Sequence, residues 1–262
     1  MESGEYLMAD PIVYILQPVS FIIGACVGSF LNVVIHRLPN NQSIVSPGSH
    51  CPDCGSPIKA YDNIPLISWV ALWGLCRDCG AVISARYFII ELFTAILTMA
   101  IAGKYGVSLQ TLVYLGLAWS LVAATVIDIS YQIIPDEISI GLLAVGLAIS
   151  PFMAIGFTSA SFGALLGGGI FFTLAIIYPG GMGGGDIKLM AGIGSILGWK
   201  MTLLTIIAGT TLGAAGGLLL MALTGGSRKT RIPFGPFLAA GAIISILWGA
   251  DIISAYLRSM GG

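Results

Sequence analysis

A glycine-rich stretch places one carboxylate, Asp186, at the start of an apolar run: Pro179-Gly180-Gly181-Met182-Gly183-Gly184-Gly185-Asp186-Ile187-Lys188. A second carboxylate, Asp128, lies at the end of an earlier apolar run. Two carboxylates that are held close together share one proton. One of them can then activate a water molecule as general base while the other polarises a carbonyl group. We therefore predict that Asp128 and Asp186 meet and form a catalytic pair.

The residues around Asp186 have a second predicted role. Gly183, Gly184 and Gly185 leave the backbone bare, so that an extended polypeptide can lie against it. Lys188 can stabilise a nearby carboxylate or reach lipid headgroups. We expect Gly183, Gly184, Gly185 and Lys188 to contact a substrate. The alternative is that Asp186 only caps the helix that it begins, because a carboxylate complements the positive end of a helix dipole.

Four of the five cysteines form two C-x₂-C pairs that are separated by 21 residues. The pairs are Cys51-Pro52-Asp53-Cys54 and Cys76-Arg77-Asp78-Cys79. Four thiolates can close a tetrahedral site, which suits Zn²⁺. Because such a site has no open position for water, we expect one structural zinc ion rather than a catalytic one. His36 and His50 are possible substitute ligands.

The composition indicates where these groups must be held. The chain of 262 residues is 56% hydrophobic and 9% charged, and its mean hydropathy is +0.96. Its apolar runs lie at about 11–35, 87–103, 109–127, 138–155, 162–178, 187–198, 201–223 and 234–256. They predict an all-α polytopic membrane protein with about eight transmembrane helices and a small zinc-binding domain between helices 1 and 2. The net charge of −1 gives no reason to expect a nucleic-acid partner.

We divide the chain into a first transmembrane helix (1–35), a cysteine domain (36–86) and a membrane-embedded domain (87–262). Eight spans would place eight basic residues on one side of the membrane and three on the other. The first group is Arg37, Lys59, Arg77, Arg86, Lys188, Arg228, Lys229 and Arg231, and the second is Lys104, Lys200 and Arg258. The positive-inside rule then places the cysteine domain and both aspartates at the cytoplasmic face, where disulfides are disfavoured.

In this order, the motifs resemble those of the type IV prepilin peptidases, the bifunctional leader peptidase/N-methyltransferases. Gly183-Gly184-Gly185-Asp186 resembles their G-x-G-D motif, and Asp128 with Pro135-Asp136 resembles their D-x₆-P-D stretch. The other matching segments are Gly28-Ser29-Phe30-Leu31-Asn32-Val33, the two C-x₂-C pairs, Ser84-Ala85-Arg86-Tyr87 with Glu91, and Ile232-Pro233-Phe234-Gly235-Pro236-Phe237. G-x-G-D alone is shared with presenilin-like proteases, so the combination carries the resemblance.

The resemblance implies an enzyme of the bacterial inner membrane, with prepilins or pseudopilins and membrane lipid as partners. It would cut the short basic leader after a Gly at the cytoplasmic face, with Asp128 and Asp186 as the catalytic residues. It would then methylate the new N-terminal amine with S-adenosylmethionine, an activity that the resemblance links to the cysteine domain. No motif predicts the methyl-donor site, and the segment around Trp73-Gly74-Leu75 is the best candidate. Glu91 either orients a substrate or the methyl donor, or pairs with Arg86.

Two other classes of protein account for part of the sequence. An ion-coupled transporter would use Asp128 and Asp186 as a relay between helices that are broken at glycines. That hypothesis leaves the four-cysteine segment unexplained. A zinc-bearing scaffold protein would instead leave the glycine-rich stretch before Asp186 without a role.

Overall fold

The computed structural model describes residues 11–178, 182–224 and 233–260. Within these ranges the regular secondary structure is helical, apart from two isolated antiparallel bridges, His50 with Pro57 and Leu75 with Val82. The predicted substrate stretch begins outside the described residues, at 179–181. The basic residues Arg228, Lys229 and Arg231 lie outside them as well.

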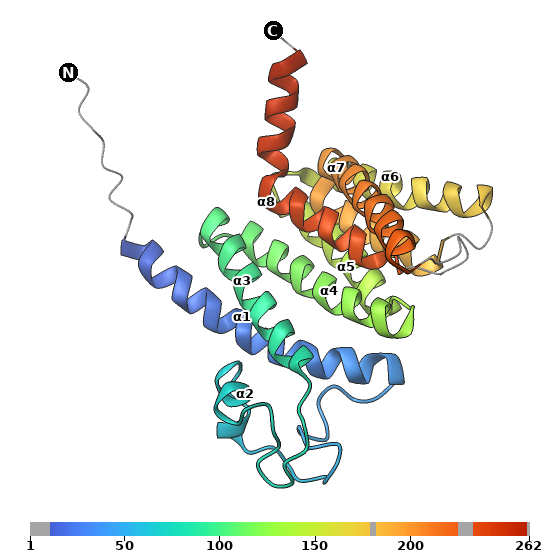
Figure 1. Ribbon diagram of the computed structural model, residues 1–262. Helices are drawn as coiled ribbons and strands as arrows, with labels where there is room; N and C mark the ends of the chain where they lie inside the picture. Colours follow the sequence, from blue (N-terminus) through green and yellow to red (C-terminus); the bar gives the residue numbers. More distant parts are fainter. Residues whose placement is uncertain (1–10, 179–181, 225–232, 261–262) are drawn as a thin grey trace. The chain divides into compact units, whose positions relative to one another are not determined.

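The chain forms two compact units (Figure 1). The N-terminal unit comprises Met1–Phe30 and Gly48–Thr111, and the C-terminal unit comprises Leu31–Pro47 and Leu112–Gly262. The helices are α1 (Pro11–Arg37), η1 (Leu38–Asn40), η2 (Ala60–Asp62), α2 (Ile67–Ala71), α3 (Ala85–Tyr105), α4 (Leu109–Tyr131), α5 (Asp136–Ile149), η3 (Ser150–Phe152), α6 (Gly156–Ile177), α7 (Gly184–Thr224) and α8 (Gly235–Met260).

Six helices among the described residues are long and apolar enough to cross a membrane: α1, α3, α4, α6, α7 and α8. The all-α class is thus confirmed, whereas the count of about eight spans is not. The predicted run at 138–155 folds as α5, which has only 14 residues, and continues into η3. The runs at 187–198 and 201–223 are joined in α7, but Gly198 breaks its helical geometry with φ 72° and ψ 166°. These two runs therefore form two helical segments that meet at Gly198.

Glycines allow the helices of the C-terminal unit to pack closely around α7. A Cβ atom on Gly163 of α6 or Gly194 of α7 would collide with the carbonyl oxygen of the other glycine. On another side of α7, a Cβ on Gly192 would lie 2.9 Å from the Ser139 carbonyl oxygen of α5. Small residues at such crossings let membrane helices approach each other. The high glycine content is therefore used here to pack α5 and α6 against α7, the helix that begins beside Asp186.

In the N-terminal unit, α1 and α3 pack together in the same manner. A Cβ on Gly24 would lie 2.7 Å from Ala95 Cα, and a Cβ on Gly28 would lie 2.7 Å from Glu91 Cα. The two glycines are one helical turn apart and so face the same neighbour. This contact is the structural reason for Gly28 in the Gly28-Ser29-Phe30 segment.

The contact between α6 and α7 predicts different outcomes for two substitutions in α6. Gly163→Ala should lower the free energy of unfolding by about 1–3 kcal/mol, because the added methyl group has no room. Gly169→Ala is the matched control, since nothing lies within 4 Å of a Cβ at that position. Thermal unfolding in detergent should separate the two variants. Equal melting temperatures would contradict the packing described here.

Candidate active site and metal centre

Asp128 occupies the last turn of α4 and is only 6% exposed. Its Oδ2 accepts a hydrogen bond of 2.9 Å from the backbone N–H of Gly235. Gly235 is the first residue of α8, so the carboxylate lies at the positive end of that helix dipole. A buried carboxylate is costly without such a partner. The hydrogen bond therefore explains how Asp128 is accommodated inside the C-terminal unit.

Gly235 is required at this position because the carboxylate approaches its backbone. A Cβ at residue 235 would lie 2.7 Å from Asp128 Oδ2 and 3.3 Å from its Cγ. Any side chain would push the carboxylate away from the helix start. In the sequence, Gly235 stands out only as part of the Ile232-Pro233-Phe234-Gly235-Pro236-Phe237 segment. Its role as a hydrogen-bond donor could not be recognised, because no side chain is involved.

Asp186 is the third residue of α7 and is partly buried. Its Oδ2 accepts a hydrogen bond of 3.2 Å from the N–H of Gly183, the residue just before the helix. Its own backbone N–H donates to the Gly183 carbonyl oxygen, also at 3.2 Å. In a capping box, the side chain of the third helical residue accepts a hydrogen bond from the backbone N–H of the N-cap residue. Asp186 and Gly183 make this bond. Asp186 therefore caps α7, and the cap occupies only one of its two carboxylate oxygens among the described residues.

Two contacts bring the surroundings of the two aspartates together. A Cβ on Gly185 would lie 3.0 Å from Ile134 Cβ, in the loop after α4. Lys188 Nζ lies 2.7 and 2.8 Å from the two carboxylate oxygens of Asp136, at the start of α5. The start of α7 thus lies against the segment that follows Asp128.

The residues predicted to contact a substrate differ in their surroundings. Gly184 faces open space, with nothing within 4 Å of the position of a Cβ, whereas Gly185 packs on Ile134. Gly183 uses its N–H to bind Asp186. Lys188 is paired with Asp136, and both side chains are about half exposed. Such an exposed ion pair contributes little to stability, so a charged ligand can displace it at low cost.

The four paired cysteines of the N-terminal unit form one cluster. Their sulfur atoms all lie within 4.8 Å of one another, and Cys51 Sγ is 3.9 Å from Cys79 Sγ. A tetrahedron with Zn–S bonds of about 2.3 Å has sulfur–sulfur distances of about 3.8 Å. The cluster therefore fits a single tetrahedral ion. His36 and His50 are not members of it, and His50 Nδ1 instead lies 3.1 Å from the Gly48 carbonyl oxygen.

The two knuckles of this cluster have the same local geometry, displaced by 25 residues. Gly55 N–H donates to the Cys51 carbonyl oxygen, and Gly80 N–H donates to that of Cys76, both at 2.9 Å. Both glycines have φ of 72°, in the left-handed region that glycine adopts most easily. In the first knuckle, hydrogen bonds from the Ser56 hydroxyl and backbone lower the pKa of the Cys54 thiol to about 7. In the same cluster the pKa of the Cys79 thiol is raised, so the thiolate that a metal ion requires is favoured at Cys54 but not at Cys79.

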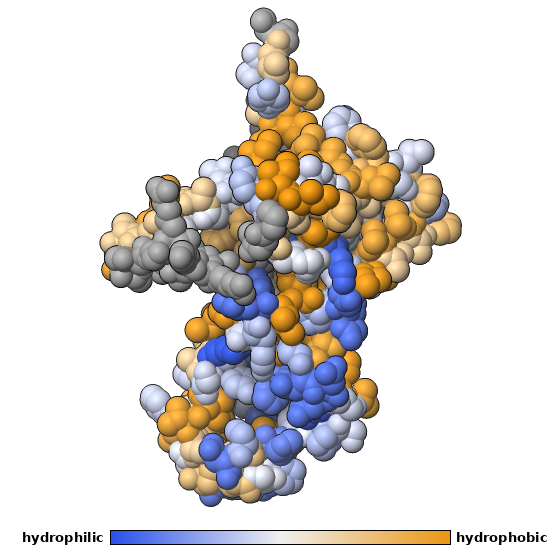
Figure 2. Space-filling model, turned by 90° about the vertical axis from the view of Figure 1, so that its right-hand side faces the viewer, coloured by the Kyte–Doolittle hydropathy of each residue, from blue (hydrophilic) through white to orange (hydrophobic). Residues whose placement is uncertain are grey.

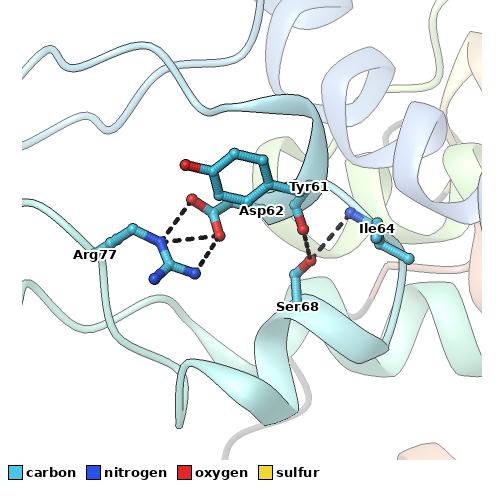
Figure 3. Close-up of polar contacts among 5 residues, drawn as sticks. All are labelled: Tyr61, Asp62, Ile64, Ser68 and Arg77. Atoms are coloured by element: carbon cyan, nitrogen blue, oxygen red, sulfur yellow. Dashed lines mark hydrogen bonds and ion pairs between the residues drawn. The ribbon is translucent and has the colours of Figure 1, made fainter.

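A network of polar contacts links the second knuckle to α2 (Figure 3). Arg77 lies between Cys76 and Cys79, and its guanidinium binds the Asp62 carboxylate at 2.7–3.1 Å. This ion pair holds the pKa of Asp62 below its usual range. The next residue back, Tyr61, accepts a hydrogen bond of 3.0 Å from Ser68 of α2 through its carbonyl oxygen. The metal centre is thus connected to α2 through η2.

Glu91 binds the residue that precedes α2. It is 8% exposed, and its Oε2 accepts a hydrogen bond of 2.7 Å from the Leu66 N–H, just before α2. Ser29 of α1 is a second hydrogen-bond partner. No ion pair joins Glu91 to Arg86 in the described part of the chain, so that predicted pairing is absent. Near the proposed methyl-donor segment, Gly74 N–H binds the Trp69 carbonyl oxygen and Trp73 is 87% exposed.

Fold and sites together define a polytopic helical membrane protein with carboxylates at the end of α4 and the start of α7, and with a four-cysteine cluster. Residues 115–218 match the model of the Type IV leader peptidase family, and residues 22–105 match that of the Bacterial Peptidase A24 N-terminal domain. The chain therefore belongs to the type IV leader peptidase family. This membership argues against the transporter and scaffold hypotheses.

Several relatives extend over nearly the whole chain. A Pseudomonas aeruginosa protein named prepilin leader peptidase/N-methyltransferase is 36% identical, over 98% of this chain and 98% of its own length. A protein of the same name from Aeromonas hydrophila is 37% identical, over 91% and 93%. One from Legionella pneumophila is 32% identical, over 90% and 92%. No solved structure matches the chain.

The cysteine cluster predicts the metal content of the purified protein. The wild-type chain should carry about one zinc ion, and Cys76→Ser should lose it, because three thiolates no longer close the site. Cys26→Ser is the control, since Cys26 lies in α1 outside the cluster. Elemental mass spectrometry measures the zinc. A Cys76→Ser variant with full zinc content would contradict the assignment of the ligands.

Proposed function

We propose that this protein is a prepilin leader peptidase that uses Asp128 and Asp186 as its catalytic pair, and that it also N-methylates its product. The observation that carries the proposal is that the start of α7, which holds Asp186, lies against the loop that follows Asp128, within a chain of this family. The substrates would be prepilins or pseudopilins, cut after a Gly at the end of their short basic leader.

The hydrogen bonds of the two carboxylates support a division of roles between them. Asp128 receives its bond at 2.9 Å from the start of a long helix, and Asp186 receives its bond at 3.2 Å from Gly183. Both carboxylates lie at the start of a long helix, so the helix dipole favours the ionised form of each, and the shorter hydrogen bond favours the ionised form of Asp128 more strongly. We therefore assign the negative charge to Asp128, as general base, and the shared proton to Asp186.

Cleavage then follows from these two protonation states. Asp128 removes a proton from a water molecule, whose oxygen adds to the carbonyl carbon of the scissile Gly residue. Asp186 donates its proton to the carbonyl oxygen, which yields a neutral tetrahedral intermediate. When the C–N bond breaks, the proton held by Asp128 passes to the leaving amine. Both residues end ready for the next cycle once Asp186 has regained the proton that the collapsing intermediate releases.

The substrate would lie beside the start of α7. Among the described residues, nothing lies within 4 Å of a Cβ at Gly184, and the flanking Gly183 and Gly185 carry no side chains that would obstruct a polypeptide there. Lys188 can leave Asp136, whose carboxylate then becomes available to a basic leader. The location that fits this arrangement is the bacterial inner membrane with the site facing the cytoplasm. Membrane lipid is a partner, and the acidic net charge favours no nucleic-acid partner.

The second reaction is assigned to the cysteine domain, residues 36–86. S-adenosylmethionine would supply the methyl group for the new N-terminal amine. The four cysteines would hold a structural zinc ion that fixes the two knuckles and, through Arg77 and Asp62, the position of α2. The remaining residues, 87–262, would form the peptidase domain.

The two activities can be separated in one crossed experiment in detergent. Asp128→Asn and Asp186→Asn should each lower cleavage of a purified prepilin at least 10³-fold, because one proton-transfer group is lost. Both variants should still methylate a pilin supplied without its leader. Cys76→Ser should show the reverse pattern, with methylation reduced far more than cleavage. Gel mobility reports the cleavage, and transfer of a labelled methyl group reports the methylation.

Glu137→Gln is the matched control, since it neutralises an exposed carboxylate in the first turn of α5. Cleavage at the wild-type rate in both aspartate variants would refute the two-carboxylate mechanism. Equal loss of both activities in Cys76→Ser would show that the cysteine module is needed for folding of the whole chain and would refute its separate role.

Gly235→Ala tests the hydrogen bond that positions Asp128. The methyl group would have to displace the carboxylate, so kcat for cleavage should fall about 10- to 100-fold with little change in KM. Gly141→Ala, in α5, adds the same methyl group where nothing lies within 4 Å of it. A similar melting temperature of the two variants shows that folding is intact. An unchanged kcat in Gly235→Ala would contradict the positioning role.

A further inference from the structure

Large apolar side chains are exposed on and beside α2, in the cysteine module. Ile67 is 65% exposed, Val70 is 56% exposed and Trp73 is 87% exposed. Leu66, Ile67, Val70 and Ala71 line a shallow hollow of about 360 Å³. Apolar surface also lies beside polar surface on the cysteine module, at the bottom of Figure 2. We call Ile67, Val70 and Trp73 the α2 face. Three large apolar side chains exposed this close together need a covering partner.

The position of α2 along α3 indicates what covers this face. Leu66 N–H binds Glu91, the seventh residue of α3. At about 1.5 Å per residue, Glu91 lies about 9 Å from the start of the helix. The Trp69 ring contacts Phe88 with a centroid distance of 5.2 Å, and its Nε1–H binds the Ile83 carbonyl oxygen at 3.2 Å. The segment therefore lies alongside the first two turns of α3 rather than beyond its end.

These first turns of α3 belong to a helix that can cross the membrane. Ile89 is 60% exposed and Phe93 is 49% exposed, as expected for side chains that face lipid. A segment that runs beside them reaches the same depth as the boundary between headgroups and acyl chains. Aromatic and aliphatic side chains are favoured at that boundary, and Trp most of all.

The polar contacts of α2 keep it at this depth. The buried Glu91 carboxylate binds its start, and Ser68 ties it to η2 through the Tyr61 carbonyl oxygen. Lys59 and Arg77 lie over the Tyr61 ring, 5.8 and 5.6 Å from its centroid. An apolar face with aromatic residues and cations close by is the composition of a segment that lies in the membrane interface.

We propose that the α2 face inserts into the lipid bilayer at the interface beside α3, so that the cysteine module is docked on the membrane and not only tethered to it. The occupant is lipid rather than a protein, because the face is held level with a membrane-spanning helix. This proposal does not depend on the catalytic assignments, since it rests on the depth of α2 alone.

Photocrosslinking in lipid nanodiscs tests the docking with the full chain. Benzoylphenylalanine is placed at Ile67 or Val70, with Ile96 in α3 as the lipid-facing reference and Asp53 in the first knuckle as the water-facing control. After illumination, mass spectrometry identifies what each position has labelled. We expect lipid adducts at positions 67 and 70 in yields within about twofold of position 96, and at least about fivefold above position 53.

Lipid yields at positions 67 and 70 that match position 53 would overturn the proposal. Crosslinks from these positions to an added prepilin, or to a second copy of the chain, in place of lipid would overturn it equally. Zinc content and melting temperature of each labelled protein show that the module is folded. A further readout is Val70→Asp, which should lower labelling at position 67 several-fold without changing the bound zinc, because a carboxylate is expelled from the interface.

Discussion

The hydrogen bond between Asp128 and Gly235 is the interaction on which the C-terminal unit depends. A carboxylate that is 6% exposed among apolar helices has to find a donor, and the start of α8 supplies one. The bond fixes where α4 ends relative to where α8 begins. The start of α7 joins the same region through Gly185, which packs on Ile134. The end of α4 and the starts of α7 and α8 therefore lie together. A backbone hydrogen bond joins α8 to α4, and glycine at positions 185 and 235 leaves room for the close approach.

The N-terminal unit is organised by a different chain of contacts. The four thiols hold the two knuckles, Arg77 and Asp62 connect the second knuckle to η2, and Ser68 connects η2 to α2. Glu91 then binds α2 to α3. Each of these contacts is either an ion pair or involves a buried side chain. The cysteine module has little hydrophobic core of its own, so these contacts define its local structure. The stability of a module this small depends on such polar and metal-binding contacts, because its hydrophobic core is too small to stabilise it alone.

The sequence was sufficient to predict the helical class and the gathering of four cysteines into one cluster that could hold a metal ion. The pairing of Asp128 with Asp186 stays a prediction. Apolar runs reveal membrane helices because length and composition alone determine them, and C-x₂-C spacing reveals knuckles. The number of membrane-spanning helices was harder to predict from the sequence. Gly198 ends one helical segment without ending the apolar run, and α5 stops after 14 residues although apolar residues continue into η3. The pairing of Glu91 with Leu66 was also beyond prediction, because its partner is a backbone N–H from a distant loop.

Each of the two aspartates is bound by the main chain of a glycine, Gly235 for Asp128 and Gly183 for Asp186. In each case one carboxylate oxygen accepts this bond, so the two oxygens of the carboxylate have different surroundings. The groups that orient these carboxylates are then peptide amides, which every side-chain replacement except proline retains. Alanine scanning would overlook them unless the added methyl group happened to clash. Replacing the amide by an ester, which deletes the donor and leaves the side chains untouched, addresses these positions directly.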